Sequence, residues 1–366
     1  MLTSLLVAGI GASLLVPTVA MAKTKVKVPA NVLAAQKALV PYLNPNPVIS
    51  LPPLSSTPPT GKNINFITCP VTICLSVQQG VQAAAAKLGW NVNVINGGLS
   101  VASWISAMDQ ATQTPADAVL GIALLPNSAI QSDLTTLASK NIPWIADVSA
   151  SPVGQNDMLA NEGSADSLAI SGKIMADWII ADSNAKANTA FFWDPALSVL
   201  SGVKQTFTTE MNRLCPKCSV NIQTTSFSSG IGTTDPGQIV SYVQSHPAVK
   251  YLVMTNGDAM VGVTQALAAA GLSGKVKILT RSADVINLKD MAKGTEAMGV
   301  TSEGPEAGWR MVDAAARYFV GDSLACCTAP TGTYHILTKK TLPHNLSVPW
   351  TVPHYQSYFL KAWHVQ

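Results

Sequence analysis

The sequence predicts an α/β protein with two similar lobes, each a parallel sheet covered by helices. Short apolar runs, typical of strands buried on both faces, alternate along the chain with segments whose apolar residues recur at helical spacing. One set of these units is complete by residue 148, and the alternation restarts after a short crossing at 149–157. The stretch 251–271 shows one unit in full: an apolar run, a polar loop, and a helical pattern that ends at Gly271.

The first lobe is expected to contain four strands and the helices that connect them. The expected strands are residues 63–68, 91–95, 118–125 and 142–148. The expected helices begin near Leu75, cover about 101–111, and open at Pro126-Asn127-Ser128. The run 118–125 is apolar throughout, which predicts a central strand covered on both faces.

The second lobe repeats this order after an extended segment at 159–162. Its expected strands are residues 189–193, 219–225, 251–254, 276–281 and 296–301. Its expected helices are 165–181, about 198–214, one opened by Asp235-Pro236, one after residue 258, and one near 286–292. A last helix at 305–320, supported by an Asp313 and Arg317 pair and ended by Gly321, can return to the first lobe.

Composition indicates a folded protein that is exported. A length of 366 residues with 48% hydrophobic and 12% charged residues predicts two globular domains. A net charge of +3 without a long basic run argues against a nucleic-acid partner. Residues 1–22 have an apolar core and end in Ala20-Met21-Ala22, a pattern that signal peptidase cuts, so the mature chain is expected to begin at Lys23. No cysteine follows the apolar core to carry a lipid anchor, and an uncleaved tethering helix is the alternative.

Residues 23–61 are predicted to form a proline-rich arm. The part from 28 to 62 is rich in proline and lacks apolar periodicity apart from one short helical pattern at 31–39. We therefore expect an extended, partly polyproline segment outside the core.

The six cysteines fall in three close pairs, which in an exported protein indicates local disulfides. Cys69 with Cys74 is expected to shape a loop at the ligand edge, and Cys215 with Cys218 to close a loop away from it. A redox role for the second pair is disfavoured because the motif follows a helical stretch instead of opening one. The adjacent Cys326 and Cys327 are left open, because a vicinal bridge strains the peptide between them.

The parallel direction of the expected strands predicts where a ligand binds. In open α/β sheets, ligands bind beyond the carboxyl ends of the strands. Asn256 and Asp258 lie in the polar loop that directly follows the strand 251–254, so they are candidate ligand contacts. The alternative is that Asp258 only caps the helix that follows.

Four segments together resemble a known family. They read DAVLGIALLPNSAIQSDLTTLASKNIPWIADVS, NEGSADSLAISGKIMADWI, TNGDAMVGVTQALAAAG and GVTSEGPEAGWRMVDAAARYFVG. In this order they are similar to type I periplasmic solute-binding proteins of the ribose-binding group, the receptors of ATP-binding cassette (ABC) importers. The resemblance runs from Lys62 to about Gly321. It implies two Rossmann-like lobes joined by a three-crossing hinge: 62–148 plus about 303–327, and 149–302 plus about 328–366.

The resemblance also implies a ligand site between the lobes. The candidate ligand-binding residues are Thr72, Asn127, Asp147, Trp193, Asn256, Asp258, Arg281, Ser302 and Glu303. Sugar binders of the family carry an aromatic pair in the first loop and several carboxylates. Here the first loop is CPVTIC, Asn127 follows the proline, residues 199–201 include no arginine, and Arg281 stands where an aspartate is expected. The loss of these groups disfavours a simple pentose or hexose.

Two candidate contacts have alternative roles. Arg281 suits a ligand that bears a carboxylate or carbonyl, but it can instead pair with Asp284 or Glu303 inside the second lobe. Trp193 can offer a stacking face for a ligand or lie in the core.

The function implied by the resemblance is capture of a small organic ligand by hinge closure and delivery to an ABC permease. A receptor that reports the ligand to a membrane signalling protein is the alternative, and we expect a monomer in either case. Neither HExxH nor GxSxG occurs in the sequence, so we expect no enzyme, metal or cofactor.

Overall fold

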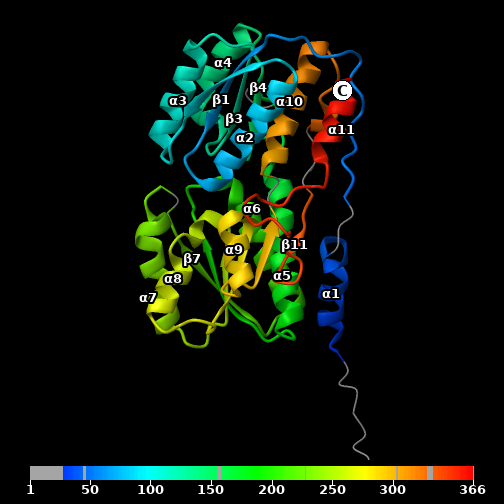
Figure 1. Ribbon diagram of the computed structural model, residues 1–366. Coiled ribbons are helices and arrows are strands. Elements are labelled where there is room, and N and C mark those ends of the chain that lie inside the picture. The colour runs from blue at the N-terminus through cyan, green and yellow to red at the C-terminus, as the bar shows by residue number, and fades with distance from the viewer. Residues whose placement is uncertain are drawn as a thin grey trace, which may run out of the picture.

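The computed structural model describes residues 28–43, 47–154, 158–226, 228–301, 304–327 and 333–365. Its strands form two separate sheets, which lie one above the other in Figure 1. Both sheets are mostly parallel and flanked by helices, which confirms the predicted α/β fold. The predicted signal peptide, Ser302 and Glu303 lie outside the described residues.

The first sheet, the upper one in Figure 1, has the strand order β2-β1-β3-β4-β5, and all neighbouring strands are parallel. Its strands are β1 (Asn63–Thr68), β2 (Asn91–Asn96), β3 (Ala118–Ile122), β4 (Trp144–Asp147) and β5 (Met158–Asn161). Helices α2 (Thr72–Lys87) and α10 (Pro305–Val320) pack together at this sheet, and α3 (Val101–Gln113) packs on α4 (Gln131–Ser139). Every residue of β3 and β4 is buried, as expected for strands covered on both faces.

The second sheet has the order β11-β10-β9-β8-β6-β7, and only the edge strand β11 is antiparallel to its neighbour. Its strands are β6 (Asn188–Trp193), β7 (Ser219–Thr224), β8 (Tyr251–Met254), β9 (Lys277–Ala283), β10 (Met298–Thr301) and β11 (Ile336–Leu337). Its helices are α5 (Ala165–Asp182), α6 (Ser201–Leu214), α7 (Asp235–Ser245), α8 (Val263–Ala269) and α9 (Val285–Lys293). Short helical turns are Asn127–Ile130, Ser198–Leu200, Gly230–Thr234, Gly257–Met260 and Ala325–Cys327.

Two expected boundaries are wrong. The segment 158–161 forms β5 and pairs with β4, so the chain leaves the first sheet after Asn161 and not at residue 149. The helix expected directly after residue 258 is split into the turn Gly257–Met260 and α8, because Gly262 adopts a φ of 78° between them. Gly271, at a φ of 70°, ends the unit as predicted.

The expectation that the proline-rich arm lies outside the core is wrong. Its helix α1 (Ala30–Leu43) packs against α5 and buries Val32, Ala35 and Leu39. Further along, the Leu54 N–H donates to the carbonyl of Ala362 at 2.8 Å. The arm therefore contacts both the helix layer of the second sheet and the C-terminal segment. No helix of the part of the chain that the structure describes is long and apolar enough to cross a membrane.

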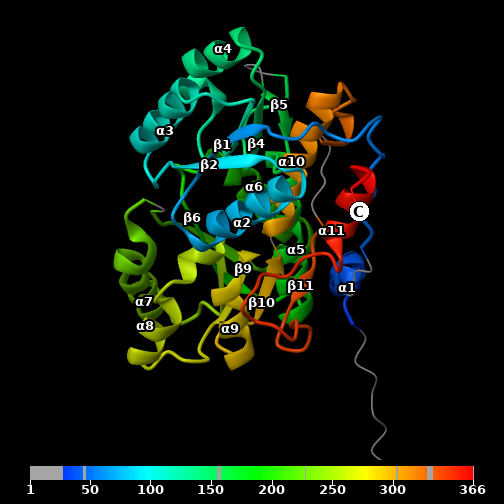
Figure 2. The same cartoon turned by 45° about the horizontal axis from the view of Figure 1, so that its top comes forward.

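The C-terminal segment, from about residue 328 to 366, was expected to belong to the second lobe alone. The structure shows that its described part contacts both the second sheet and the helices that cover the first. Strand β11 extends the second sheet, whereas α11 (Tyr355–Ala362) packs on α10 of the first. Trp363, just after α11, stacks on Trp309 of α10 with ring centroids 5.3 Å apart. This segment and the arm run side by side along one edge of the molecule, next to α10 (Figures 1 and 2).

Two glycines allow α2 and α10 to approach closely. A Cβ atom at Gly80 of α2 would lie 2.0 Å from the Pro305 carbonyl oxygen, and one at Gly308 of α10 would lie 2.4 Å from the Val77 carbonyl oxygen. No side chain fits at either position, so the first turn of α10 lies directly on α2.

Candidate ligand-binding site

Two adjoining cavities lie between the sheets, where strands of each sheet end. Ile122 and Asp147 come from the ends of β3 and β4 in the first sheet, and Arg281 comes from β9 in the second. The two cavities share six lining residues, which makes them parts of one cleft. These are Ile73, Val77, Asp147, Val148, Arg281 and Ser282.

The lining is mainly apolar. The larger cavity, about 500 Å³ between protein atoms, is bounded by aliphatic side chains from both sheets. They are Ile73, Val77, Ile122, Leu124, Val148, Leu197, Val199 and Leu200. The polar exceptions are few, chiefly Asp147, Asn256, Arg281 and Ser282. Such a lining, with a few placed polar groups, is typical of small-molecule sites.

The charged groups of the cleft come from opposite sheets. Burial raises the pKa of Asp147 to about 6, although the Val148 N–H and the positive charge of Arg281 both oppose the increase. The Arg281 guanidinium, only 8% exposed, donates from Nη1 to the Thr255 carbonyl at 3.4 Å. A carboxyl group and a guanidinium group thus face one apolar space, and the positive charge of Arg281 partly offsets the effect of burial on the pKa of Asp147.

Backbone strain coincides with these two charged residues. Val148, which follows Asp147, has a φ of 57°, and Ser282, which follows Arg281, has a φ of 56°. Positive φ values are uncommon for residues other than glycine, and for a β-branched valine they are genuine outliers. Such strain clusters at binding sites, where surrounding structure holds it. One strained residue, directly after β4, and another, at an irregularity near the end of β9, therefore border the cleft from the two sheets.

Asp258 does not cap the helix that follows it. The N-cap of α8 is Gly262, which has no capping side chain, and Asn256 caps only the short turn Gly257–Met260, where its side-chain oxygen accepts from the Asp258 N–H at 3.1 Å. Asp258 instead reaches the other sheet's layer, where its Oδ1 accepts from the Thr72 N–H at 3.3 Å. Thr72 opens α2, and the N-cap of α2 is Val71, which has no polar side chain to serve the free N–H groups. Asp258 supplies the missing cap from across the cleft.

A second polar contact joins α2 to the N-cap of α9. The Ser76 hydroxyl of α2 donates to Asp284 Oδ2 at 3.3 Å, while Asp284 Oδ1 accepts from the Val285 N–H at the start of α9. Both carboxylates are buried, and burial raises the pKa of each, that of Asp258 to about 6 with a further contribution from the negative charge of Asp284. Figure 2 shows α2 directly above β9, in keeping with these contacts. These two contacts join the layers of the two sheets across the cleft.

A model of the periplasmic binding protein domain matches residues 60–323, which include the first sheet, the second sheet except β11, and the whole cleft except Tyr334. The chain belongs to the periplasmic binding protein family. The family consists of substrate-binding proteins, which confirms the expectation of a binding protein and not an enzyme. Membership also indicates a periplasmic location. No curated protein matches the sequence.

Solved structures of other periplasmic binding proteins share this fold. A 5-methylthioribose transporter solute-binding protein from Thermotoga lettingae is 14% identical, with a TM-score of 0.69 over 84% of this chain and 95% of its own. An ABC transporter solute-binding protein from Agrobacterium vitis with bound allitol is 19% identical, with a TM-score of 0.64 over 77% and 97%. A glucose-galactose binding protein from Geobacillus stearothermophilus is 17% identical, with a TM-score of 0.65 over 77% and 99%.

In this periplasmic binding protein the predicted site residues are only partly brought together. Asp147, Asn256 and Arg281 line the larger cavity. Asn127 is buried, and its N–H donates to the Ser151 hydroxyl at 2.9 Å. Trp193 is not one of the described residues that line either cavity, and the Lys204 ammonium lies 3.6 Å from its ring centroid. Thr72 contributes its backbone to the contact with Asp258, and a role for Ser302 and Glu303 stays a prediction.

Sequence reasoning missed most of the apolar lining. Ile73 and Val77 occupy the first turns of α2, and Leu197, Val199 and Leu200 lie around the turn before α6. In the sequence such aliphatic residues look like ordinary core residues, because a local pattern does not show which element they face. The one available signal was the segment 199–201, where the family's arginine is replaced by aliphatic residues.

The cysteine pair in the first loop borders the cleft. Cys69 and Cys74 form a disulfide with Cα atoms 5.4 Å apart, and Cys74 lines the larger cavity. The bridge holds the end of β1 against the first turn of α2. Cys215 and Cys218 form a second disulfide beyond the end of α6, away from the cleft.

Proposed function

We propose that this protein is an exported solute-binding protein that captures a small organic ligand in the cleft and delivers it to the permease of an ABC importer. The observation that carries the proposal is an apolar cleft between two sheets into which Asp147 and Arg281 face from opposite sides. Family membership supports capture of a solute, and the similar solved structures support delivery to an importer, since two of them are named as transporter components.

The lining favours a ligand with a substantial apolar body and one or two polar groups. A sugar ring presents hydroxyl groups around its whole edge, and each needs a partner when it is buried. This cleft offers few such partners beside its aliphatic side chains. An arginine beside the cleft suits a carboxylate or carbonyl on the ligand, because charged hydrogen bonds of this kind are strong and directional. 5-Methylthioribose, the ligand of one similar structure, likewise combines a polar ring with an apolar thioether.

Closure of the two lobes around the ligand is part of the proposal. In the closed form Asp258 caps α2 from the opposite side of the cleft, and Ser76 contacts Asp284. Opening would expose these groups and leave the first N–H groups of α2 to water. The contacts therefore stabilise the closed state by an amount of the order of one helix cap, about 0.5–2 kcal/mol.

The remaining features of the proposal are the processing and the oligomeric state of the exported protein. The signal peptide is removed after Ala22, and the protein acts as a monomer. An oxidising compartment preserves the disulfides Cys69–Cys74 and Cys215–Cys218.

A thermal-shift screen tests the proposal directly. The library contains sugars, polyols, aromatic acids, branched aliphatic acids and small amides, each at a fixed excess. A ligand bound only by the folded protein stabilises it by about 2.7 kcal/mol at a hundredfold excess over its dissociation constant. We expect hits among the acids and amides. Hits confined to unsubstituted sugars would contradict the proposed ligand class. The proposal of solute capture is contradicted if no compound binds and native mass spectrometry of periplasmic protein shows no bound solute.

Arg281→Ala should weaken binding of a carboxylate-bearing hit. Loss of a charged hydrogen bond costs about 1.5–3 kcal/mol, which corresponds to roughly a 10- to 150-fold higher dissociation constant in calorimetry. Arg213→Ala is the matched control, because Arg213 is exposed and pairs with Glu210 at 2.6 Å outside the cleft. Equal affinities of the two variants would remove Arg281 from the site.

A further inference from the structure

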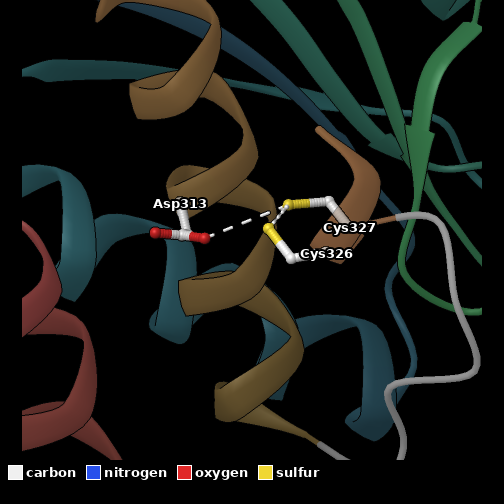
Figure 3. Close-up of side chains that lie close together, drawn as sticks. All are labelled: Asp313, Cys326 and Cys327. Atoms are coloured by element: carbon white, nitrogen blue, oxygen red, sulfur yellow. Dashed lines mark hydrogen bonds between the residues drawn. The ribbon is translucent and has the colours of Figure 1, made fainter. Parts of the chain in front are cut away.

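A second cluster of reactive side chains lies away from the cleft. Cys326 and Cys327 occupy the turn Ala325–Cys327 after α10, and their Sγ atoms are 3.3 Å apart (Figure 3). The Cys327 thiol points to Asp313 of α10, with 4.0 Å between Sγ and Oδ2. Both are free thiols, whereas the other four cysteines form disulfides. The chain thus carries one reduced pair at sulfur-to-sulfur contact.

The two thiols have different surroundings. Cys326 is half-buried, and Cys327 is only 3% exposed. A hydrogen bond from the Cys327 thiol, together with the positive charge of Arg317, lowers the pKa of Cys326 to about 7. The same hydrogen bond and burial raise the pKa of Cys327. One sulfur is therefore an accessible thiolate near neutral pH, and its neighbour stays a protonated thiol.

A metal ion is the less suitable occupant of this cluster. Asp313 Oδ2 accepts from Arg317 Nε at 2.7 Å, and Oδ1 accepts from Trp363 Nε1 at 2.7 Å. A guanidinium beside the carboxylate repels a cation but stabilises a thiolate. Two sulfurs alone also fall short of the four ligands that a structural zinc site uses.

We propose that Cys326 and Cys327 are a reversible thiol–disulfide exchange site. The Cys326 thiolate attacks a disulfide of a partner molecule and forms a mixed disulfide, and one partner thiolate leaves. Cys327 then gives up its proton, which ends on the second departing partner sulfur, and its thiolate attacks Cys326 Sγ. The two cysteines lose two electrons, which reduce the partner disulfide to two thiols.

Covalent geometry makes the resulting bridge easier to reduce than the other two. Consecutive Cα atoms are held about 3.8 Å apart by the trans peptide, below the usual range for a disulfide of about 4.4–6.8 Å. The Cys69–Cys74 and Cys215–Cys218 bridges have Cα separations of 5.4 and 5.3 Å, within that range. Strained bridges are the labile ones. The pair therefore cycles under conditions in which the structural disulfides persist.

The test is a redox titration of the full mature chain. The protein is equilibrated in glutathione buffers of graded reduced-to-oxidised ratio, alkylated, digested and analysed by mass spectrometry. We expect the Cys326–Cys327 peptide to pass from doubly alkylated to internally bridged at ratios that leave the other two disulfides intact. Double alkylation at every ratio overturns the proposal, and so does a bridge that resists reduction as well as Cys69–Cys74.

Two variants test the assigned order of attack. Cys327→Ser should accumulate glutathione on Cys326, whereas Cys326→Ser should leave the buried Cys327 largely unmodified. If a variant does not fold, brief alkylation of the reduced native chain gives the same information, because Cys326 should react roughly tenfold faster or more. Equal rates at the two sulfurs overturn the assignment. Protection of both sulfurs by added zinc, without any bridge under oxidising ratios, would assign a metal site instead.

Discussion

Asp258 should make closure of the cleft dependent on pH. In the closed structure burial raises the pKa of Asp258 from its ordinary value of 3.8 to about 6, with a further contribution from Asp284. In an open, hydrated cleft the pKa returns toward the ordinary value. The closed state therefore binds the proton more tightly, and closure is most favourable below pH 4 and weakens as the pH rises through 6.

The size of this effect follows from the pKa difference. About two units, each worth about 1.4 kcal/mol, correspond to about 3 kcal/mol less favourable closure at pH 7.5 than below pH 4. Ligand affinity should fall by up to roughly 100-fold over this interval, if the ligand itself does not titrate there. Asp258→Asn removes the charge but keeps an oxygen for the Thr72 N–H, so its affinity should fall less with pH than that of the wild type. The fall that remains comes from Asp147 and Asp284, whose pKa values burial also raises. Asp258→Ala should show the same reduced pH dependence but bind more weakly than the Asn variant by about 0.5–2 kcal/mol, the value of a lost cap.

Calorimetry between pH 4 and 7.5, with the radius of gyration from small-angle scattering at each pH, measures both affinity and closure. Asp109→Asn, on the exposed side of α3, is the matched control and should follow the wild type. The reasoning is refuted if wild type and Asp258→Asn show the same pH dependence, or if closure strengthens as the pH rises.

Three further outcomes are expected. Burial raises the pKa of Glu296 to about 8, so the protein should become progressively less stable from pH 4.5 to 8, by on the order of a few kcal/mol. In urea unfolding, the stability of Glu296→Gln should depend less on pH than that of the wild type. An unchanged pH dependence would contradict this prediction. Gly80→Ala should destabilise the protein by about 1–3 kcal/mol or prevent folding, because its Cβ would meet the Pro305 carbonyl. Gly237→Ala is the control and should not destabilise the protein by this contact, because the space around its Cβ is open. Similar melting temperatures for the two variants would be evidence against the close contact at Gly80. N-terminal sequencing of periplasmic protein should begin at Lys23, and a chain that retains Met1 would exclude cleavage.

Local pattern alone determined much of the fold. Strands β1 and β8 and helix α10 have the bounds expected from apolar runs, helix caps and glycine stops. The polar loop after β8 also pointed to Asn256, because parallel strands bring their carboxyl ends to one edge of a sheet, whereas Asp147 and Arg281 were expected only from the family resemblance. These features depend on neighbours within a few residues, so the sequence reports them directly.

The tertiary structure decided everything that depends on contacts between distant segments. The arm packs against α5, and the aliphatic residues around 73–77 and 197–200 line a cleft; the local apolar pattern shows that these residues are buried but not which element they face. The partner of Asp258 is a helix N-terminus 186 residues away, whereas its position in the sequence suggested only a ligand contact or a local cap. A residue's chemistry is written in the sequence, but its burial and its partner, which set its pKa and its role, exist only once the two sheets are packed together.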